Sequence, residues 1–256
     1  MRFLGLFALG VFLLGLSQTP ASPSVSRKVH SCPPAWKAPS LPRRRGTKII
    51  HADVTGDGKI DLVSIRYAPR AWSSCGYFLT VKTPRRFYSA RISFFVVPSK
   101  KMSVLASERW YGLREPYVGQ VVQLAPRHRQ IVVGYSHGAS TSQVLLYEVV
   151  NGRLQWLRMP RMYGGQLSLF GSVADGDMAL CHPGGPLTVA SYGAGLHGRF
   201  GFSRVVYRLR GGRISAIWRK NQTIPGRKFG KLQDRWRLAA TTAFDGCTVA
   251  RGQRLS

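Results

Sequence analysis

Short apolar runs separated by Gly, Pro and Asn make up most of the chain from Lys48 onward. Most runs are rich in Val, Ile, Tyr, Phe and Trp, and none is long enough for a convincing amphipathic helix. Asn151-Gly152 and Gly211-Gly212 are typical of tight hairpin turns between two such runs. The pattern therefore predicts an all-β domain. Its expected strands are Lys48–Ala52, Leu62–Tyr67, Tyr77–Lys82, Ile92–Val97, Gln130–Tyr135, Val144–Val150, Leu154–Leu157, Leu187–Ser191, Arg204–Leu209, Ile214–Trp218 and Trp236–Thr242.

A repeat with a spacing of sixty residues runs through the second half of the chain. His137-Gly138 recurs as His197-Gly198, and the residues that follow match without a gap. Asp61–Tyr67 followed by Tyr77–Lys82 is a weaker third copy. Chance is the alternative, but strand units at a fixed period are typical of propellers and other repeat-built sheets. We expect a repeat-built, β-propeller-like or sandwich-like sheet assembly. The matched positions are Leu145/Val205, Leu146/Val206, Tyr147/Tyr207, Val149/Leu209, Gly152/Gly212, Arg153/Arg213 and Leu154/Ile214.

Residues 1–21 have the layout of a secretory signal peptide. Arg2 supplies a short positive region, Phe3–Leu16 is apolar, and small residues precede a cleavage site expected after Ala21. The apolar run is shorter than the roughly 20 residues that a membrane-spanning helix needs, so an uncleaved anchor is the less favoured alternative. We therefore expect a protein that is secreted or held at the cell surface.

The rest of the chain divides into two parts by composition. Residues 22–46 are rich in Pro and contain Arg43-Arg44-Arg45, which indicates a basic, Pro-rich linker. Residues 47–256 carry the strand pattern and are long enough for one domain with a sizeable core. We expect this part to form the β repeat domain.

All four cysteines follow the expected signal peptide. An even number in an exported protein predicts two disulfides, and three pairings are possible. We favour Cys32–Cys75 and Cys181–Cys247, each of which would link positions within one half of the chain. No two cysteines lie close together in the sequence, which disfavours a zinc site.

The formal net charge of the chain is +28 at pH 7. A charge of this size would draw the protein to an anionic surface or polymer, such as teichoic acid, acidic lipid, polysaccharide or nucleic acid. The Arg residues are spread along the whole chain, so GC-rich coding is the alternative explanation. No short basic motif identifies one ligand.

Asp53–Asp61 reads Asp-Val-Thr-Gly-Asp-Gly-Lys-Ile-Asp, a pattern that suits a calcium-binding loop. Alternate residues of such a loop point inward, and Gly at position 6 permits a sharp turn. Calcium prefers oxygen ligands, and this loop supplies them at positions 1, 3, 5, 7 and 9. The expected ligands are the side chains of Asp53, Thr55, Asp57 and Asp61 and the carbonyl of Lys59.

An EF-hand is disfavoured for this loop. Its twelfth position is Ser64 rather than Glu, and the flanking residues are strand-like. The chain has ten acidic residues, and three of them fall within these nine positions, a clustering that a bound Ca²⁺ would neutralise. An Asp-Gly turn with solvated carboxylates is the alternative. Thr55 in place of the usual Asp or Asn should weaken the affinity.

At this loop the chain resembles the FG-GAP/VCBS-type repeat proteins, whose repeats open with Asp-x-Asn-Gly-Asp-Gly-x-x-Asp followed by a Leu-Val strand. Asp53–Val63 matches this form, and Val173–Asp177 is similar to a degenerate second loop. The layout is also similar to secreted actinobacterial proteins of this kind. The resemblance implies a propeller-like β fold, a structural calcium ion and a binding role at the surface, with no catalytic residue.

Gly134-Tyr135-Ser136-His137-Gly138 fits the Gly-x-Ser-x-Gly nucleophile elbow of serine hydrolases. An elbow must lead into a helix, however, and Val144–Val150 is strand-like. The repeat copy of the motif has Leu196 at the position of the nucleophile. We therefore expect an exported, calcium-stabilised binding module at the cell envelope or in the medium, without catalysis, and a secreted serine esterase or lipase is the alternative.

Overall fold

The computed structural model describes residues 34–43, 48–67, 76–92, 116–125, 128–137, 141–160, 162, 165–169, 175–181, 186–228, 231, 244 and 247–255. The chain divides into two compact units, residues 1–30 and 31–256, and every described residue belongs to the second. The expected signal peptide, residues 1–21, lies outside the described residues.

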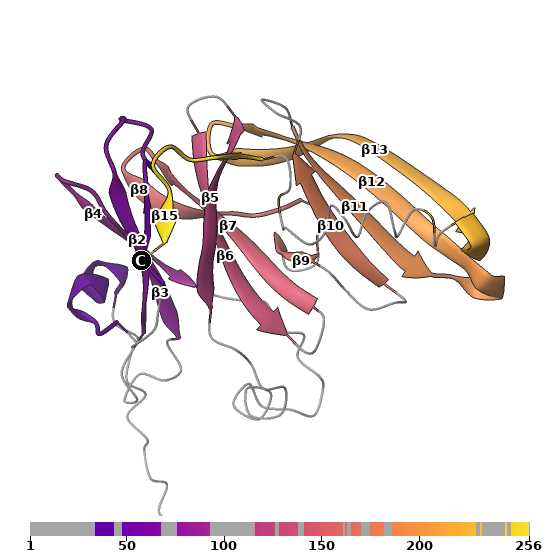
Figure 1. Ribbon diagram of the computed structural model, residues 1–256, viewed down its shortest axis with the longest axis horizontal. Coiled ribbons are helices and arrows are strands. Elements are labelled where there is room, and N and C mark those ends of the chain that lie inside the picture. The colour runs from indigo at the N-terminus through magenta and orange to yellow at the C-terminus, as the bar shows by residue number, and fades with distance from the viewer. Residues whose placement is uncertain are drawn as a thin grey trace, which may run out of the picture. The chain divides into compact units, whose positions relative to one another are not determined.

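The second unit is all-β, as the sequence predicts, and contains three antiparallel meanders in which each strand pairs with the next (Figure 1). The first meander comprises β1 (Ile50–Ala52), β2 (Asp61–Tyr67), β3 (Tyr77–Lys82) and β4 (Phe87–Ile92). The second comprises β5 (Tyr117–Ala125), β6 (His128–His137), β7 (Thr141–Val150) and β8 (Arg153–Leu157). The third comprises β10 (Asp175–Cys181), β11 (Leu187–Ala194), β12 (Arg199–Arg210) and β13 (Arg213–Pro225).

Three short strands complete two sheets. β9 (Leu167–Leu169) pairs with β7 and, in parallel, with β10, which joins the second and third meanders into one ten-stranded sheet. β14 (Thr248–Val249) pairs with β5, and β15 (Arg254–Leu255) pairs with β1 in a five-stranded sheet. Both sheets are open, since β4 and β15 lie at the edges of one and β13 and β14 at the edges of the other.

The middle meander is buried on both faces. Val121, Ile131 and Leu145 point into a core shared with the first meander, whereas Val132 and Leu146 point into a core shared with the third. This alternation follows from the strand period, because successive side chains point to opposite faces of a sheet. The three meanders therefore pack as successive layers.

The sixty-residue repeat corresponds to whole structural units. β5–β8 and β10–β13 have the same antiparallel order, and the hairpin turns at Asn151-Gly152 and Gly211-Gly212 adopt the positive φ angles that the sequence predicts. Tyr147 and Tyr207 occupy matching, fully buried positions. Each hydroxyl donates a hydrogen bond to a backbone carbonyl, of Arg91 at 3.2 Å and of Pro160 at 3.1 Å.

Part of the expected linker packs onto the first meander. A 3₁₀ helix, η1 (Ala35–Ser40), brings Ala38 and Leu41 against Phe78 in a small buried cluster. Arg66 donates a hydrogen bond from Nη1 to the carbonyl of Leu41 at 3.1 Å. The packed part of the chain thus includes residues 34–43, upstream of the boundary expected at residue 47.

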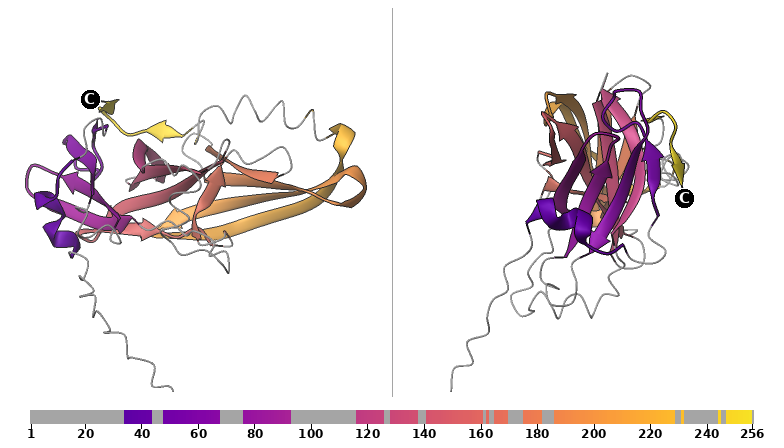
Figure 2. Two further views of the ribbon diagram at one scale, coloured as in Figure 1. Left: turned by 90° about the horizontal axis from the view of Figure 1, so that it is seen from below. Right: turned by 90° about the vertical axis from the view of Figure 1, so that its left-hand side faces the viewer.

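Residues 247–255, here called the C-terminal strap, contact all three meanders (Figure 2, yellow). Cys247 forms a disulfide with Cys181 at the end of β10, which confirms this predicted pairing. Ala250 donates a backbone hydrogen bond to Val121 in β5, and Gln253 accepts one from the Val121 amide at 2.7 Å. β15 then pairs with β1. The other predicted pair, Cys32 and Cys75, lies outside the described residues.

Several strands differ from the sequence prediction. β4 (Phe87–Ile92), β5 and β10 were not expected, and the expected strand Ile92–Val97 lies outside the described residues beyond Ile92. β5 contains Gly119 and two Gln residues, which dilute its apolar pattern. The expected strand Trp236–Thr242 lies outside the described residues. In the part of the chain that is described, no helix is long and apolar enough to cross a membrane.

Removing the Cys181–Cys247 disulfide should destabilise the domain. The bridge closes a loop across 66 residues, and the chain-entropy model gives about 4 kcal/mol for a loop of that length. The C181A/C247A double variant should therefore unfold at a clearly lower urea concentration than the wild type. An unchanged midpoint would contradict the role of the strap. Peptide mapping without reductant would test both predicted pairings, Cys181–Cys247 and Cys32–Cys75.

Candidate functional site

The predicted calcium loop, Asp53–Asp61, connects β1 to β2 at the start of the first meander. Gly56 and Gly58 both have positive φ angles, 75° and 83°, which residues other than glycine rarely adopt. These two residues let the backbone turn twice within the loop. The loop is fastened to the C-terminal strap, because the Asp53 amide donates a hydrogen bond to the Arg251 carbonyl at 3.2 Å.

Two buried carboxylates organise the loop. Asp53 accepts hydrogen bonds from the amides of Gly56 at 2.8 Å and Gly58 at 3.1 Å. One oxygen of Asp61, Oδ2, accepts hydrogen bonds from the Val54 amide at 3.0 Å and from the amide and hydroxyl of Thr55 at 3.1 and 3.2 Å. Backbone donors aimed at carboxylates therefore hold both side chains in fixed positions inside the loop.

The other oxygen of Asp61, Oδ1, is buried and has no hydrogen-bond partner among the described residues. The whole residue is 0% exposed. Burial raises the pKa of the Asp61 carboxyl above its usual value of 3.8, against the effect of its hydrogen bonds to Thr55 and Val54, and the nearby Asp57 raises it further. An ionised, unpartnered oxygen in such a position is costly unless a cation or a proton accompanies it.

The residues of the loop fit a calcium ion by their chemistry. The expected donors are all oxygens, the ligand type that Ca²⁺ prefers, and the orphaned Oδ1 of Asp61 supplies an acceptor with no other use. Asp57 and Lys59 are exposed and Thr55 is half-buried. Across the described ranges, no group of three or more His, Cys, Asp or Glu side chains stands close enough to hold a metal by itself. The carbonyl of Lys59 and the hydroxyl of Thr55 would thus be needed as ligands.

The second, degenerate loop expected at Val173–Asp177 is wrong for Asp175–Asp177, and Val173 and Ala174 lie outside the described residues. Asp175 and Asp177 lie in β10 and pair with Gly193 and Ser191 of β11. The backbone here is an extended, paired strand rather than a turning loop, so it does not wrap around a single point as a calcium loop does.

The Gly-x-Ser-x-Gly motif does not form a nucleophile elbow. Ser136 and His137 are the last residues of β6 and pair with Ser142 and Thr141 of β7, so the chain continues into another strand of a hairpin. Gly134 has a structural explanation, because a side chain there would collide with the ring of Tyr117. Gly138 lies outside the described residues.

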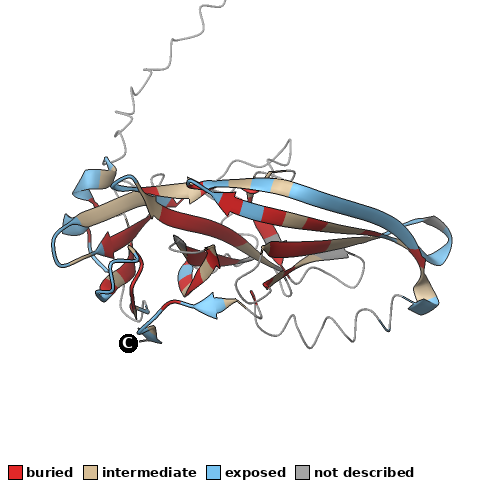
Figure 3. Ribbon diagram, turned by 90° about the horizontal axis from the view of Figure 1, so that it is seen from above, coloured by how far each residue is buried: buried red, intermediate tan, exposed pale blue. Residues whose placement is uncertain are grey.

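The outer face of β12 and β13, directed away from the core that the middle and third meanders share, is a basic surface that sequence reasoning missed. Figure 3 shows in pale blue that much of these two strands is exposed. Directly opposed residues of an antiparallel pair share one face of the sheet. Arg204 opposes Lys220, and Arg210 opposes Arg213, so like charges stand side by side twice. The chain has no Asp or Glu between Asp177 and Asp234. The outer basic face comprises Arg204, Arg208, Arg210, Arg213, Trp218 and Lys220.

Trp218 lies among these cations and is 46% exposed. The guanidinium of Arg204 stands 6.0 Å from the centre of its ring, at the outer limit of a cation–π contact. The Nε atom of Arg204 is buried without a hydrogen-bond partner among the described residues. An aromatic surface is therefore available between the two like-charged pairs.

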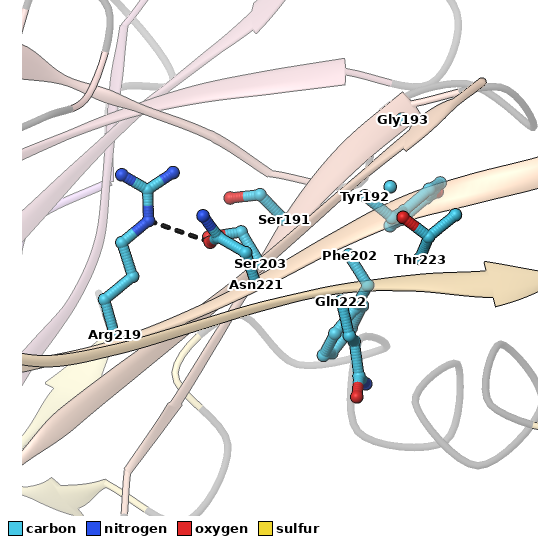
Figure 4. A pocket seen from close by; sticks show the side chains of 10 residues that line it. Ser191, Tyr192, Gly193, Phe202, Ser203, Arg219, Asn221, Gln222 and Thr223 are labelled. Carbon is cyan, nitrogen blue, oxygen red and sulfur yellow. Dashed lines mark hydrogen bonds between the residues drawn. The ribbon is translucent and has the colours of Figure 1, made fainter.

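The opposite face of the same strands carries a shallow hollow of about 400 Å³ (Figure 4). Its floor is formed by three adjacent strands, β11, β12 and β13, beyond the point where the apolar core ends. Arg219 donates a hydrogen bond from Nε to Oδ1 of Asn221 at 2.8 Å. The residues that line the hollow are Ser191, Tyr192, Gly193, Gly201, Phe202, Ser203, Arg219, Asn221, Gln222 and Thr223.

Comparisons with protein-family models, with curated proteins and with solved structures found no match for this chain.

Calcium should stabilise the protein through the Asp53–Asp61 loop. At a hundredfold excess over its dissociation constant, an ion bound only by the native state adds about 2.7 kcal/mol, which corresponds to several degrees in melting temperature. We expect calcium to raise the midpoint of the wild type and to leave that of Asp61→Asn nearly unchanged. Equal behaviour of the two proteins in calcium and in chelator would remove the loop as a metal site.

In calcium-free buffer, the stabilities of the wild type and of Asp61→Asn should depend differently on pH. Because the pKa of Asp61 is raised on folding, the native state binds its proton more tightly than the unfolded state, and the associated stability is lost as the pH rises above 3.8. Asn mimics the protonated carboxyl, so the Asp61→Asn variant does not lose this stability as the pH rises. The wild type should therefore fall in stability relative to Asp61→Asn over this range, and calcium at neutral pH should reverse the order.

Proposed function

We propose that this protein is an exported β-repeat module that binds an anionic polymer, with a calcium ion stabilising its first loop. The polymer would be of the kind found at a cell envelope, an acidic polysaccharide or a teichoic acid. The role is binding rather than catalysis.

The observation that carries this proposal is the outer basic face of β12 and β13. Like charges directly opposite each other on adjacent strands destabilise a sheet, because their repulsion is larger in the folded state than in the extended chain. Arg204–Lys220 and Arg210–Arg213 are two such pairs, and neither finds an acidic neighbour on its own or the adjacent strands. A bound polyanion would neutralise both pairs at once.

The shape of this face also suits an extended ligand. Of the four β12 residues on this face from position 204 to 210, three are cationic, Arg204, Arg208 and Arg210, and the fourth is Val206. Trp218 offers a ring on which the apolar face of a sugar can pack between the cations. Arg residues present planar donors that pair with carboxylate or phosphate through two hydrogen bonds.

Export is supported by the residues that precede and stabilise the domain. The Cys181–Cys247 disulfide is of the kind that persists in oxidising compartments. The signal-peptide pattern at residues 1–21 points to the same destination. The resemblance to FG-GAP/VCBS-type repeats is consistent with a loop of this composition between the first two strands of a four-stranded meander.

Neutralising the outer basic face should weaken polymer binding and, at the same time, raise stability. The R210Q/R213Q/K220Q variant removes one member of one opposed pair and both of the other. Its affinity for polygalacturonate or for a glycerol-phosphate teichoic acid should fall about tenfold or more, with a shallower dependence on salt. Its melting temperature at low salt should equal or exceed that of the wild type, because repulsion is relieved.

The matched control is K82Q/R85Q/R153Q, which makes the same change in net charge at exposed positions of the first and second meanders. Binding would be measured by titration at low and physiological salt, with single-stranded DNA as a second polymer. Equal losses in both triple variants would mean that net charge alone attracts the polymer. A clear preference for DNA would reject the envelope polymer as the partner.

A further inference from the structure

We infer that the hollow on the inner face of β11–β13 is a binding subsite for one or two units of an acidic glycan. This inference rests on the proposed function only for the anionic class of the ligand. Three features indicate the site itself: its glycines, its polar groups and its single guanidinium.

The glycines of the floor have no structural explanation. Gly193 and Gly201 oppose each other across β11 and β12, and neither has a positive φ angle. A Cβ added at Gly193 would meet no described atom within 4 Å, and one at Gly201 would meet only the Gly193 carbonyl, at 3.8 Å. Glycine inside a strand weakens it, and often marks a place where a ligand or another backbone approaches closely. At Gly134, by contrast, an added Cβ would collide with the ring of Tyr117.

The polar groups form an ordered array around this floor. Ser191, Ser203 and Asn221 are directly opposed on three neighbouring strands, so their side chains share one face. The next row is Gly193, Gly201 and Thr223. Figure 4 shows the serines and Asn221 on the side of the sheet that faces Arg219, whereas Phe202 and Gln222 point to the other side. Hydroxyl and amide groups above a bare backbone floor suit the hydroxyls of a sugar ring.

Arg219 makes the hollow selective for an anionic ligand. It opposes Val205, at the edge of the apolar core, and its Nε–H is engaged by Asn221. This hydrogen bond fixes the plane of the guanidinium and leaves its Nη donors for a carboxylate or a phosphate. A single cation within the hollow matches one acid group per unit. Among the described residues that line the hollow, the two aromatic ones, Tyr192 and Phe202, alternate with Ser191 and Ser203 along their strands and so point to the other face, which disfavours a stacked nucleobase.

Substitution at Gly193 tests the inference, because the added side chain should weaken ligand binding without lowering the melting temperature. Gly193→Val would fill the hollow, and it would raise strand propensity in open space, so the melting temperature should stay equal or rise. Binding of trigalacturonate, followed by titration calorimetry, should fall about tenfold or more. Arg219→Gln should reduce trigalacturonate binding similarly while leaving binding of neutral maltotriose unchanged. Thr248→Val, an exposed strand position in the strap, is the matched control.

Any one of four results would overturn the inference. A lower melting temperature for Gly193→Val would show that the chain's own residues fill the hollow. Equal binding of trigalacturonate by wild type and Gly193→Val, or no binding by the wild type, would remove the subsite. Inorganic phosphate binding as tightly as trigalacturonate would reduce it to an anion site. R210Q/R213Q/K220Q should retain trigalacturonate binding, so failure of the outer basic face and failure of the hollow remain distinguishable.

Discussion

The two-sided burial of the middle meander is the constraint on which the rest of the structure depends. Its strands carry apolar side chains on both faces, as in Ile131 and Val132, so each face must be covered to be stable in water. The first meander covers one face and the third covers the other. The C-terminal strap then fixes this order, by pairing with β1 and β5 and by its disulfide to β10.

This layered arrangement explains where the cationic side chains lie. With +28 formal charges and few acidic residues, the cations cannot be paired internally and must occupy outer faces and exposed ends. The third meander is the outer layer with the longest strands, β12 and β13, and they extend beyond the core. Its outer face therefore collects cations, while its inner face, past the last core residues, is free to carry Ser191, Ser203 and Asn221. One hairpin thus presents two chemically different surfaces.

The predicted calcium loop, Asp53–Asp61, depends on the same closing segment. Its first residue, Asp53, bonds to Arg251 of the strap, and Ile60 packs against Gly252. A cation bound by Asp53 and Asp61 would therefore stabilise the junction between β1 and the strap as well as the loop. The disulfide and the proposed calcium site, both of which suit an extracellular setting, would thus act on the same closing segment.

The sequence predicted local features well and long-range ones poorly. The all-β class and the two glycine hairpins follow from period-2 patterning and turn residues, which are local. The Cys181–Cys247 pair was favoured among three possible pairings because both cysteines lie in the second half of the chain, and the structure confirms it. The sixty-residue repeat located matching units, as Tyr147 and Tyr207 show. β10 was missed because its aspartates read as a loop.

The two proposed binding surfaces could not be read from sequence for a different reason. The opposed cations are created by strand register, including a bulge near Val206, which no short pattern reveals. The absence of acidic residues between Asp177 and Asp234 was the available signal. In the same way, the orphaned oxygen of Asp61 depends on how the loop folds over it.

Hydrogen–deuterium exchange with and without saturating polygalacturonate tests the central claim, that the third meander is the polymer-binding part of the protein, most directly. Each meander serves as an internal reference for the others, so a change in global stability can be separated from a local footprint. The account predicts slower exchange in β12 and β13, with β2 and β3 unchanged. Protection centred on the first meander, or none in β12 and β13 at saturation, would contradict it.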